Sequence, residues 1–105
     1  MAWVLLGIVC LINAPAHAQK LDYNTCTFRG KPLYGKVQIV SSFADVKIKV
    51  VSSFEDLAVQ TVSAFPDRCG KWQFVTALPD LKVQFVESFP DLKIRFVDAF
   101  PGLRR

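Results

Sequence analysis

From Lys36 to Leu103 the hydrophobic and polar residues repeat with a period of eleven. The unit occurs six times, at 36–46, 47–57, 58–68, 71–81, 82–92 and 93–103, with Cys69-Gly70 inserted after the third. Positions one to four alternate polar and apolar residues, as in Lys82-Val-Gln-Phe85. A period of two that uses β-branched and aromatic residues predicts a short strand with one buried face.

The second half of each unit predicts a tight turn. Position five is Val in all six units, which breaks the alternation and predicts a bulge, a twist or cover on the second face. Position seven is always Ser or Ala, so we expect a neighbouring segment to crowd the backbone there. Position eight is Phe, or Leu78 once, and positions nine and ten are most often Pro-Asp. Pro-Asp favours a β-turn and excludes a helix through these corners.

Eleven residues cannot bury their own apolar face, so the units must stack on one another. We expect one all-β domain, built from six strand-turn repeats and an N-terminal segment, 19–35, with short extended pieces. From the periodicity alone, a β-meander or a short β-solenoid is the expected arrangement, since knotted chains are rare.

The N-terminus carries the pattern of a secretory signal. Residues 2–14 are almost wholly apolar, and Pro15 and the small-x-small motif Ala16-His17-Ala18 follow. We predict a signal peptide over residues 1–18, cleaved between Ala18 and Gln19, although no Lys or Arg lies near its start. The alternative, an uncleaved anchor, conflicts with the short apolar run, because a membrane span needs about 20 residues. The expected location is periplasmic or secreted, with no transmembrane segment after cleavage.

Composition and cysteines refine this prediction. The chain is 51% hydrophobic, too apolar for a disordered protein, and its net charge of +4 is spread among charges of both signs. An ordinary solvated surface is expected, and nucleic acid is not an expected partner. Cys26 and Cys69 remain after cleavage and predict a disulfide in an oxidising compartment. Two free thiols or a metal site are the alternatives, although two cysteines without histidine make a poor zinc site.

The reiterated Lys-Val-x-Phe-Val-x-Ser-Phe-Pro-Asp-Leu unit, interrupted by Cys69-Gly-Lys-Trp-Gln-Phe74, resembles the bacterial septoil-knot domain family over residues 25–103. Individual corners depart from the family pattern at the following residues: Ala44, Glu55, Thr61 and Leu78. The resemblance implies a compact, knotted all-β domain with seven crossings, in which the six units and Thr25–Tyr34 supply seven passes. It also implies that small residues at position seven allow close crossings, and that the Val and Phe columns fill a ring-shaped core. It implies no catalytic residues.

The carboxylates offer the first candidate chemistry. Position ten carries a repeated Asp: Asp45, Asp56, Asp67, Asp80 and Asp91. If the corners converged, these residues could form a cation site. We favour turn formation, with the Asp paired to a Lys two residues later, as in Asp45/Lys47, Asp80/Lys82 and Asp91/Lys93. Glu87 and Asp98 share a column with Ser and Thr, which indicates a tolerant exposed position rather than an acid–base pair.

Two further sets of side chains could bind a partner. The Phe column (Phe43, Phe54, Phe65, Phe89 and Phe100) could form an aromatic platform for sugars or bases, but core packing is the predicted role. Arg104 and Arg105, with Lys93 and Arg95, could form a small basic patch, although a solvated chain end is expected.

The predicted function is therefore a small, exported, non-enzymatic structural or interaction domain. The expected partner is an envelope component or another protein. No catalytic, cofactor-binding or metal-binding residue is predicted, since the only histidine, His17, lies in the signal and no nucleophile or phosphate-loop motif is present. The alternative is a binding module for an anionic envelope component or a divalent cation. A small enzyme or a secreted inhibitor would need a deep pocket lined by carboxylates.

Overall fold

The computed structural model describes residues 20–104, so the predicted signal peptide, its cleavage between Ala18 and Gln19, and Arg105 lie outside the described residues. Among the described residues there is no helix, and the prediction of an all-β fold is confirmed. The strands are β1 (Leu21–Asp22), β2 (Thr27–Phe28), β3 (Lys31–Pro32), β4 (Gly35–Ile39), β5 (Val46–Val50), β6 (Leu57–Thr61), β7 (Lys71–Phe74), β8 (Leu81–Phe85), β9 (Leu92–Phe96) and β10 (Gly102–Leu103).

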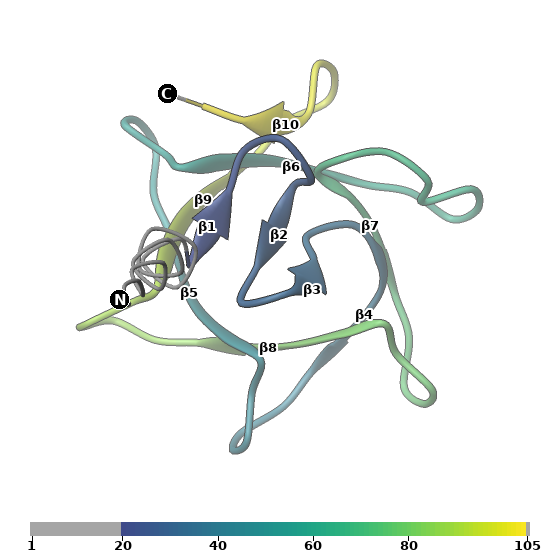
Figure 1. Cartoon of the computed structure of the whole chain (residues 1–105), viewed down its shortest axis with the longest axis horizontal. Helices are drawn as coiled ribbons and strands as arrows, with labels where there is room; N and C mark the ends of the chain where they lie inside the picture. Colours follow the sequence, from purple (N-terminus) through teal and green to yellow (C-terminus); the bar gives the residue numbers. More distant parts are fainter. Residues whose placement is uncertain (1–19, 105) are drawn as a thin grey trace, which may run out of the picture.

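Strands β4 to β9, one from each repeat unit, are parallel and close into a ring (Figure 1). Around the ring the order is β4-β8-β5-β9-β6-β7, and β7 pairs back to β4. The chain therefore travels round the ring twice. Each strand of the second circuit (β7, β8, β9) lies between two strands of the first (β4, β5, β6). A meander or a solenoid would pair units that follow one another, so both alternatives are wrong.

The loops cross the strands of the other circuit. Val83 in β8 pairs with Ile39, the last residue of β4, and with Val46, the first residue of β5. The loop between these strands, residues 40–45, must therefore pass across β8 at Val83. The same relation places a loop over position two of β4, β5 and β9. Because these position-two side chains are fully buried inside the ring, the loops pass on its outside.

The alternation of side chains between the two faces of each strand determines which of them fill the interior of the ring. Each full-length strand begins at position eleven of the preceding unit and ends at position four, so positions eleven, two and four face inward. Within strands β4 to β9, the residues at positions eleven and two are nearly inaccessible to solvent and form the core: Val37, Val46, Ile48, Leu57, Val59, Trp72, Leu81, Val83, Leu92 and Ile94. Position four lies at the end of each strand, where the ring opens, and is partly exposed.

A small antiparallel sheet, β1-β2-β3, covers the end of the ring at which the strands begin (Figure 1). Phe28 and Leu33 join the core from this cap, and the Trp72 indole Nε1 donates to the Leu33 carbonyl at 3.0 Å. The Thr25–Tyr34 segment adds no strand to the ring. The seventh strand of the larger sheet is instead β10, which pairs antiparallel with the start of β6.

Two predictions about the loops are wrong. Position seven, expected at crowded crossings, is exposed in all six units: Ser42, Ser53, Ala64, Ala77, Ser88 and Ala99. The Phe column, expected in the core, is also exposed. The physical reason is volume, because a ring of six strands has a narrow interior that one set of Val, Leu, Ile and Trp side chains already fills.

Candidate functional site

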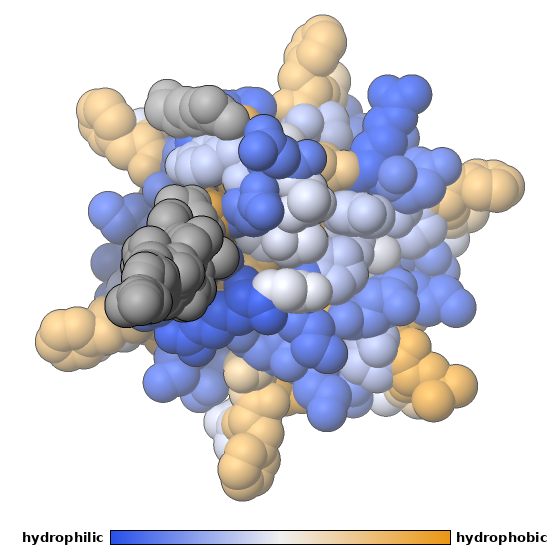
Figure 2. Space-filling view, in the orientation of Figure 1, coloured by the Kyte–Doolittle hydropathy of each residue, from blue (hydrophilic) through white to orange (hydrophobic). Residues whose placement is uncertain are grey.

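The outermost feature of the molecule is the residue at position eight, at the tip of each loop. These six side chains, which we call the loop-tip ring, are 81–93% exposed: Phe43, Phe54, Phe65, Leu78, Phe89 and Phe100. Figure 2 shows them as six apolar projections that radiate from a largely hydrophilic body. Isolated exposed apolar residues are normal, but six equivalent ones at the most protruding points form a pattern.

The backbone at each tip is also unfavourable. All six residues adopt a left-handed conformation, with φ between 53° and 58°. Bulky side chains rarely occupy this region, and such a residue costs of order 1–3 kcal/mol. Gly or Asn would suit the turn better, and a polar residue would suit the exposure better. Because the apolar tip contributes to neither the turn nor the core, it is the candidate for binding.

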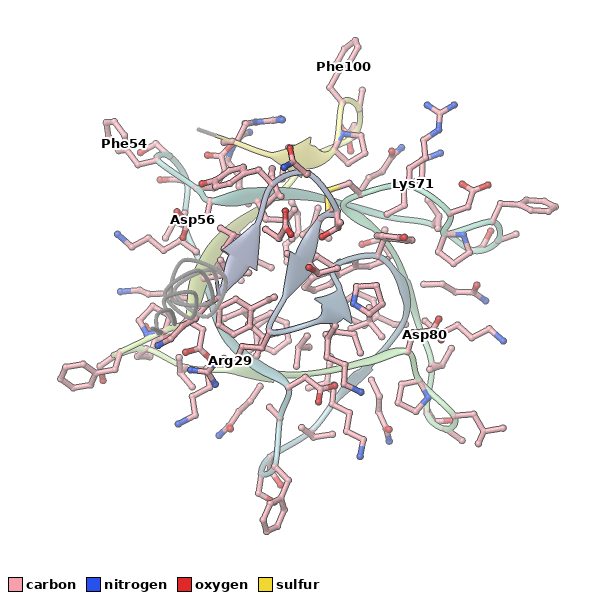
Figure 3. The ribbon with its side chains drawn as sticks, in the orientation of Figure 1. Arg29, Phe54, Asp56, Lys71, Asp80 and Phe100 are labelled. Carbon is pink, nitrogen blue, oxygen red and sulfur yellow. A yellow bond between two sulfur atoms is a disulfide. The ribbon has the colours of Figure 1, made fainter. Side chains whose placement is uncertain are left out.

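The crossings determine which tips are neighbours. Each loop lies over a strand of the other circuit, so the order of tips around the ring is Leu78, Phe43, Phe89, Phe54, Phe100 and Phe65. Neighbouring tips therefore come from different circuits, and all neighbours except Phe65 and Leu78 come from units that do not follow one another in the sequence. Figure 3 shows this for Phe54 and Phe100, which project from adjacent loops.

The lysines at position one divide the loop-tip ring into two sides. Four exposed lysines lie in the strands crossed by four consecutive tips: Lys36 under Leu78, Lys82 under Phe43, Lys47 under Phe89 and Lys93 under Phe54. Under Phe100 the equivalent residue is the buried Ala58, and under Phe65 it is the half-buried Lys71. Within residues 20–104 the four exposed lysines form no ion pair, so their ammonium groups face solvent.

The Asp column fastens the crossings rather than forming a site. Lys82 N–H donates to the Asp45 carboxylate at 2.8 Å, and Asp45 N–H donates to the Lys82 carbonyl at 2.9 Å. The same reciprocal pair joins Asp56 to Lys93, Asp80 to Lys36 and Asp91 to Lys47. The predicted pairing of Asp45, Asp80 and Asp91 with the Lys two residues later is therefore wrong. Each of the four carboxylates in these reciprocal pairs accepts a hydrogen bond from a backbone N–H in a strand of the other circuit. A pattern within a few residues of sequence cannot reveal such a partner.

Removing one of these carboxylates is expected to weaken its crossing. Asp45→Ala leaves the Lys82 N–H without its charged acceptor, and we expect a loss of roughly 1–2 kcal/mol in the free energy of unfolding. Urea denaturation of the variant measures this loss. Asp67→Ala is the matched control, because the third loop is longer and only the Asp67 backbone N–H is bonded, to the Phe65 carbonyl. Equal losses in the two variants would contradict the fastening role.

The remaining carboxylates do not assemble a reactive site. Within residues 20–104, no three residues of the types His, Cys, Asp and Glu lie close enough together to hold a metal ion. Glu87 and Asp98 are both exposed, as predicted, and lie on separate loops. The Asp98 carbonyl accepts a hydrogen bond from Gln60 Nε2 at 2.9 Å, as the Thr76 carbonyl does from Gln38 Nε2 at 3.0 Å.

Described residues 20–104 also lack a helix long and apolar enough to cross a bilayer.

Glu55 forms the ion pairs of the described chain. Its carboxylate lies 3.0 Å from the Arg95 guanidinium and 3.6 Å from Arg104 Nε, and its side chain is only 8% exposed. The hydrogen bond from Arg95 holds the pKa of Glu55 below the ordinary value of 4.5. Arg95 and Arg104, two residues of the candidate basic patch, thus share one carboxylate that offsets one of their two positive charges, and Arg104 is tied to the second loop.

Glu55→Gln is expected to make stability less dependent on pH. A carboxylate whose folded pKa is depressed stabilises the fold above its unfolded pKa, and this contribution is lost as the pH falls through the folded pKa. The melting temperature of the variant should lie below that of the wild type at pH 7, and the two should converge below pH 4.5. Thermal denaturation followed between neutral and acid pH tests this. A difference that persists unchanged in acid would assign the effect to packing.

The disulfide links the cap to the ring. Cys26 in the cap and Cys69 before β7 are bonded, with their Cα atoms 5.8 Å apart. Gly70 N–H donates to the Leu33 carbonyl at 3.1 Å, so the two inserted residues, Cys69 and Gly70, both hold the cap. Neither the disulfide nor the cap lies on the loop-tip ring.

Comparison with known proteins agrees with this fold. The model of the 7(1) septoil knot domain matches residues 30–104. The chain is also similar to an uncharacterized protein of Synechocystis sp., with 59% identity over 76 residues, which cover 64% of this chain and 68% of the relative. The segment matched by the family model, residues 30–104, includes the closed ring, all six tips and Cys69, whereas Cys26 precedes it.

Proposed function

The chain belongs to the 7(1) septoil knot domain family, and from that premise we propose that it acts as an exported, non-enzymatic interaction domain that binds anionic, amphiphilic surfaces of the cell envelope. The loop-tip ring carries this proposal. Six apolar side chains stand where they contribute nothing to the core and are the first to meet a surface that approaches from the side of the ring.

Export is supported by two features of the chain. The apolar segment 2–14, followed by Ala16-His17-Ala18, has the form of a secretory signal. The Cys26–Cys69 disulfide suits an oxidising compartment, because cytosolic thiols are kept reduced. A non-enzymatic role is supported by the Asp column, since four of its carboxylates are bonded to backbone N–H groups of the crossings.

The radial arrangement determines how a flat surface would meet the ring. Six tips that point outward in different directions cannot touch one plane together, so an approaching bilayer meets an edge formed by two neighbours. The edge between Phe43 and Phe89 has exposed lysines, Lys82 and Lys47, in the strands below. Each inserted Phe side chain stabilises binding by roughly 2 kcal/mol, and nearby lysines attract anionic headgroups. This combination favours anionic lipid over neutral lipid.

Vesicle sedimentation tests the proposal. We expect the protein to sediment with vesicles that contain phosphatidylglycerol, less with phosphatidylcholine alone, and less at high salt. The double variant Phe43→Ser and Phe89→Ser should bind the anionic vesicles at least tenfold more weakly, an order-of-magnitude expectation from the lost apolar burial.

The opposite edge supplies the matched control. Phe65→Ser and Phe100→Ser remove two equivalent tips above the buried Ala58 and the half-buried Lys71, where exposed position-one lysines are missing. This control should bind anionic vesicles almost as well as the wild type. Equal losses in both double variants would favour binding by the tips without the lysines, and undiminished binding in both would overturn the role of the loop-tip ring.

A further inference from the structure

The end of the ring opposite the cap is open and apolar. Position four of the six units lies there, at the end of each strand, and we call this set the open-end ring: Ile39, Phe85, Val50, Phe96, Thr61 and Phe74, in their order around the sheet. The five apolar members are between 36% and 54% exposed. Trp72 lies one layer deeper, with its ring centroid 6.0 Å from that of Phe74. The side chains of the inner layers are buried from solvent, whereas those of this outermost layer are partly exposed.

Short and aromatic side chains alternate around the open-end ring. The first circuit contributes the β-branched residues Ile39, Val50 and Thr61, and the second circuit contributes Phe74, Phe85 and Phe96. Because each strand of one circuit lies between two of the other, every Phe has a short residue on both sides. The end therefore presents three large aromatic side chains that alternate with three smaller ones.

A surface hollow lies beside each of two short residues, Ile39 and Thr61. One hollow of about 320 Å³ lies between β4 and β7 and is lined by Gln38, Ile39, Phe74, Val75 and Thr76. Another, of about 280 Å³, lies between β6 and β9 and is lined by Gln60, Thr61, Phe96, Val97 and Asp98. Both are open to solvent and large enough to receive the ring of a phenylalanine.

From this alternation we infer that the open-end ring is the interface of a homodimer, in which two copies meet end to end. A two-fold axis perpendicular to the ring axis relates such copies. If that axis passes between adjacent strands, it places each Phe of one copy opposite a short residue of the other. A second copy thus places a large side chain opposite each small one and a small side chain opposite each large one. This inference goes beyond the proposed function and does not depend on the loop-tip ring.

The size of the surface indicates a reversible dimer. If a whole Phe presents about 200 Å² and the smaller Ile and Val present less, the exposed parts of the five apolar side chains amount to roughly 400 Å² in each copy. Two copies would bury roughly 800 Å² of this apolar surface, which is below the roughly 1,200 Å² of stable interfaces and in the range of weak, transient ones. We expect a monomer–dimer equilibrium in which the dimer is populated at roughly micromolar to submillimolar concentrations.

Sedimentation velocity of the protein, purified in the form in which cells produce it, tests the dimer. The mean sedimentation coefficient should rise with concentration between roughly 1 µM and 1 mM, toward that of one dimer. Phe85→Glu places a charge in the interface and should weaken association at least tenfold. Ser88→Glu adds the same charge to the exposed loop after β8 and should leave association unchanged. A single monomeric species at every concentration would overturn the inference.

A second variant keeps the test independent of folding defects. Thr61→Phe removes no buried contact, because Thr61 is exposed, but it enlarges one of the three small side chains and brings two aromatic side chains face to face. We expect weaker association with an unchanged melting temperature. A dimer that persists in both Phe85→Glu and Thr61→Phe, or one that is lost in Ser88→Glu, would place the interface elsewhere and overturn the assignment.

Discussion

Gly70→Ala is expected to destabilise the fold by about 3–5 kcal/mol, by combining a strained backbone with backbone overlap. Gly70 has a φ of +85°, which L side chains rarely adopt. An added Cβ would overlap the Ala58 carbonyl oxygen and lie 2.7 Å from the Gly102 nitrogen and 2.9 Å from Pro101 Cβ. Because its neighbours here are mostly backbone atoms, they cannot move aside as a flexible side chain would.

Denaturant unfolding measures this loss, and Gly30→Ala is the matched control. Gly30 has nearly the same φ, +83°, but an added Cβ there meets no atom within 4 Å. We expect the control to lose only about 1 kcal/mol, the cost of the backbone conformation alone. If the two variants unfold at the same denaturant concentration, the close packing of the third loop against β6 and β10 is not required for stability.

Breaking the Cys26–Cys69 disulfide is expected to have the second large effect. The two residues are separated by 43 positions, and closing a loop of that length stabilises a protein by about 4 kcal/mol in the chain-entropy model. The double variant Cys26→Ser and Cys69→Ser should therefore unfold at a clearly lower urea concentration. Its cap should also exchange amide hydrogens faster than the ring, because the disulfide is the cross-link that joins them in addition to the main chain.

Reduction of the wild type provides the control for side-chain changes. A thiol reductant should lower the stability of the wild type to that of the double variant and should leave the variant unaffected. If the double variant is as stable as the oxidised wild type, the Leu33 carbonyl bonds to Gly70 and Trp72, together with the buried Phe28 and Leu33, suffice to hold the cap.

The local conformation of the chain could be predicted from its sequence. Alternation over positions one to four predicts the six strands, and the structure differs only in starting most of them one residue earlier. The Pro-Asp corners predict the turns. The cysteine pair in a chain with a signal-like N-terminus predicts the disulfide. These features depend on the backbone preferences and the chemistry of individual residues and their near neighbours. Both can be inferred directly from the sequence.

The candidate site could not be predicted in the same way. A Phe column in a small chain indicates a core, because apolar residues are usually buried. The signal that was available is its position: Phe stands directly before the Pro-Asp corner, three residues before the buried residue at position eleven. That places it at a turn rather than on a strand face, but only the volume of the ring determines that no room remains for it inside.

By itself the sequence determined the number of strands, their alternating faces and the corners between them. The tertiary structure decided which strands pair, which carboxylate holds which crossing, and that the Phe column faces solvent. The reason is that six nearly identical units carry nearly identical edges, so local pattern cannot distinguish pairing with the next unit from pairing with a unit of the other circuit. That choice depends on closing one ring around one core, a property of all six units together.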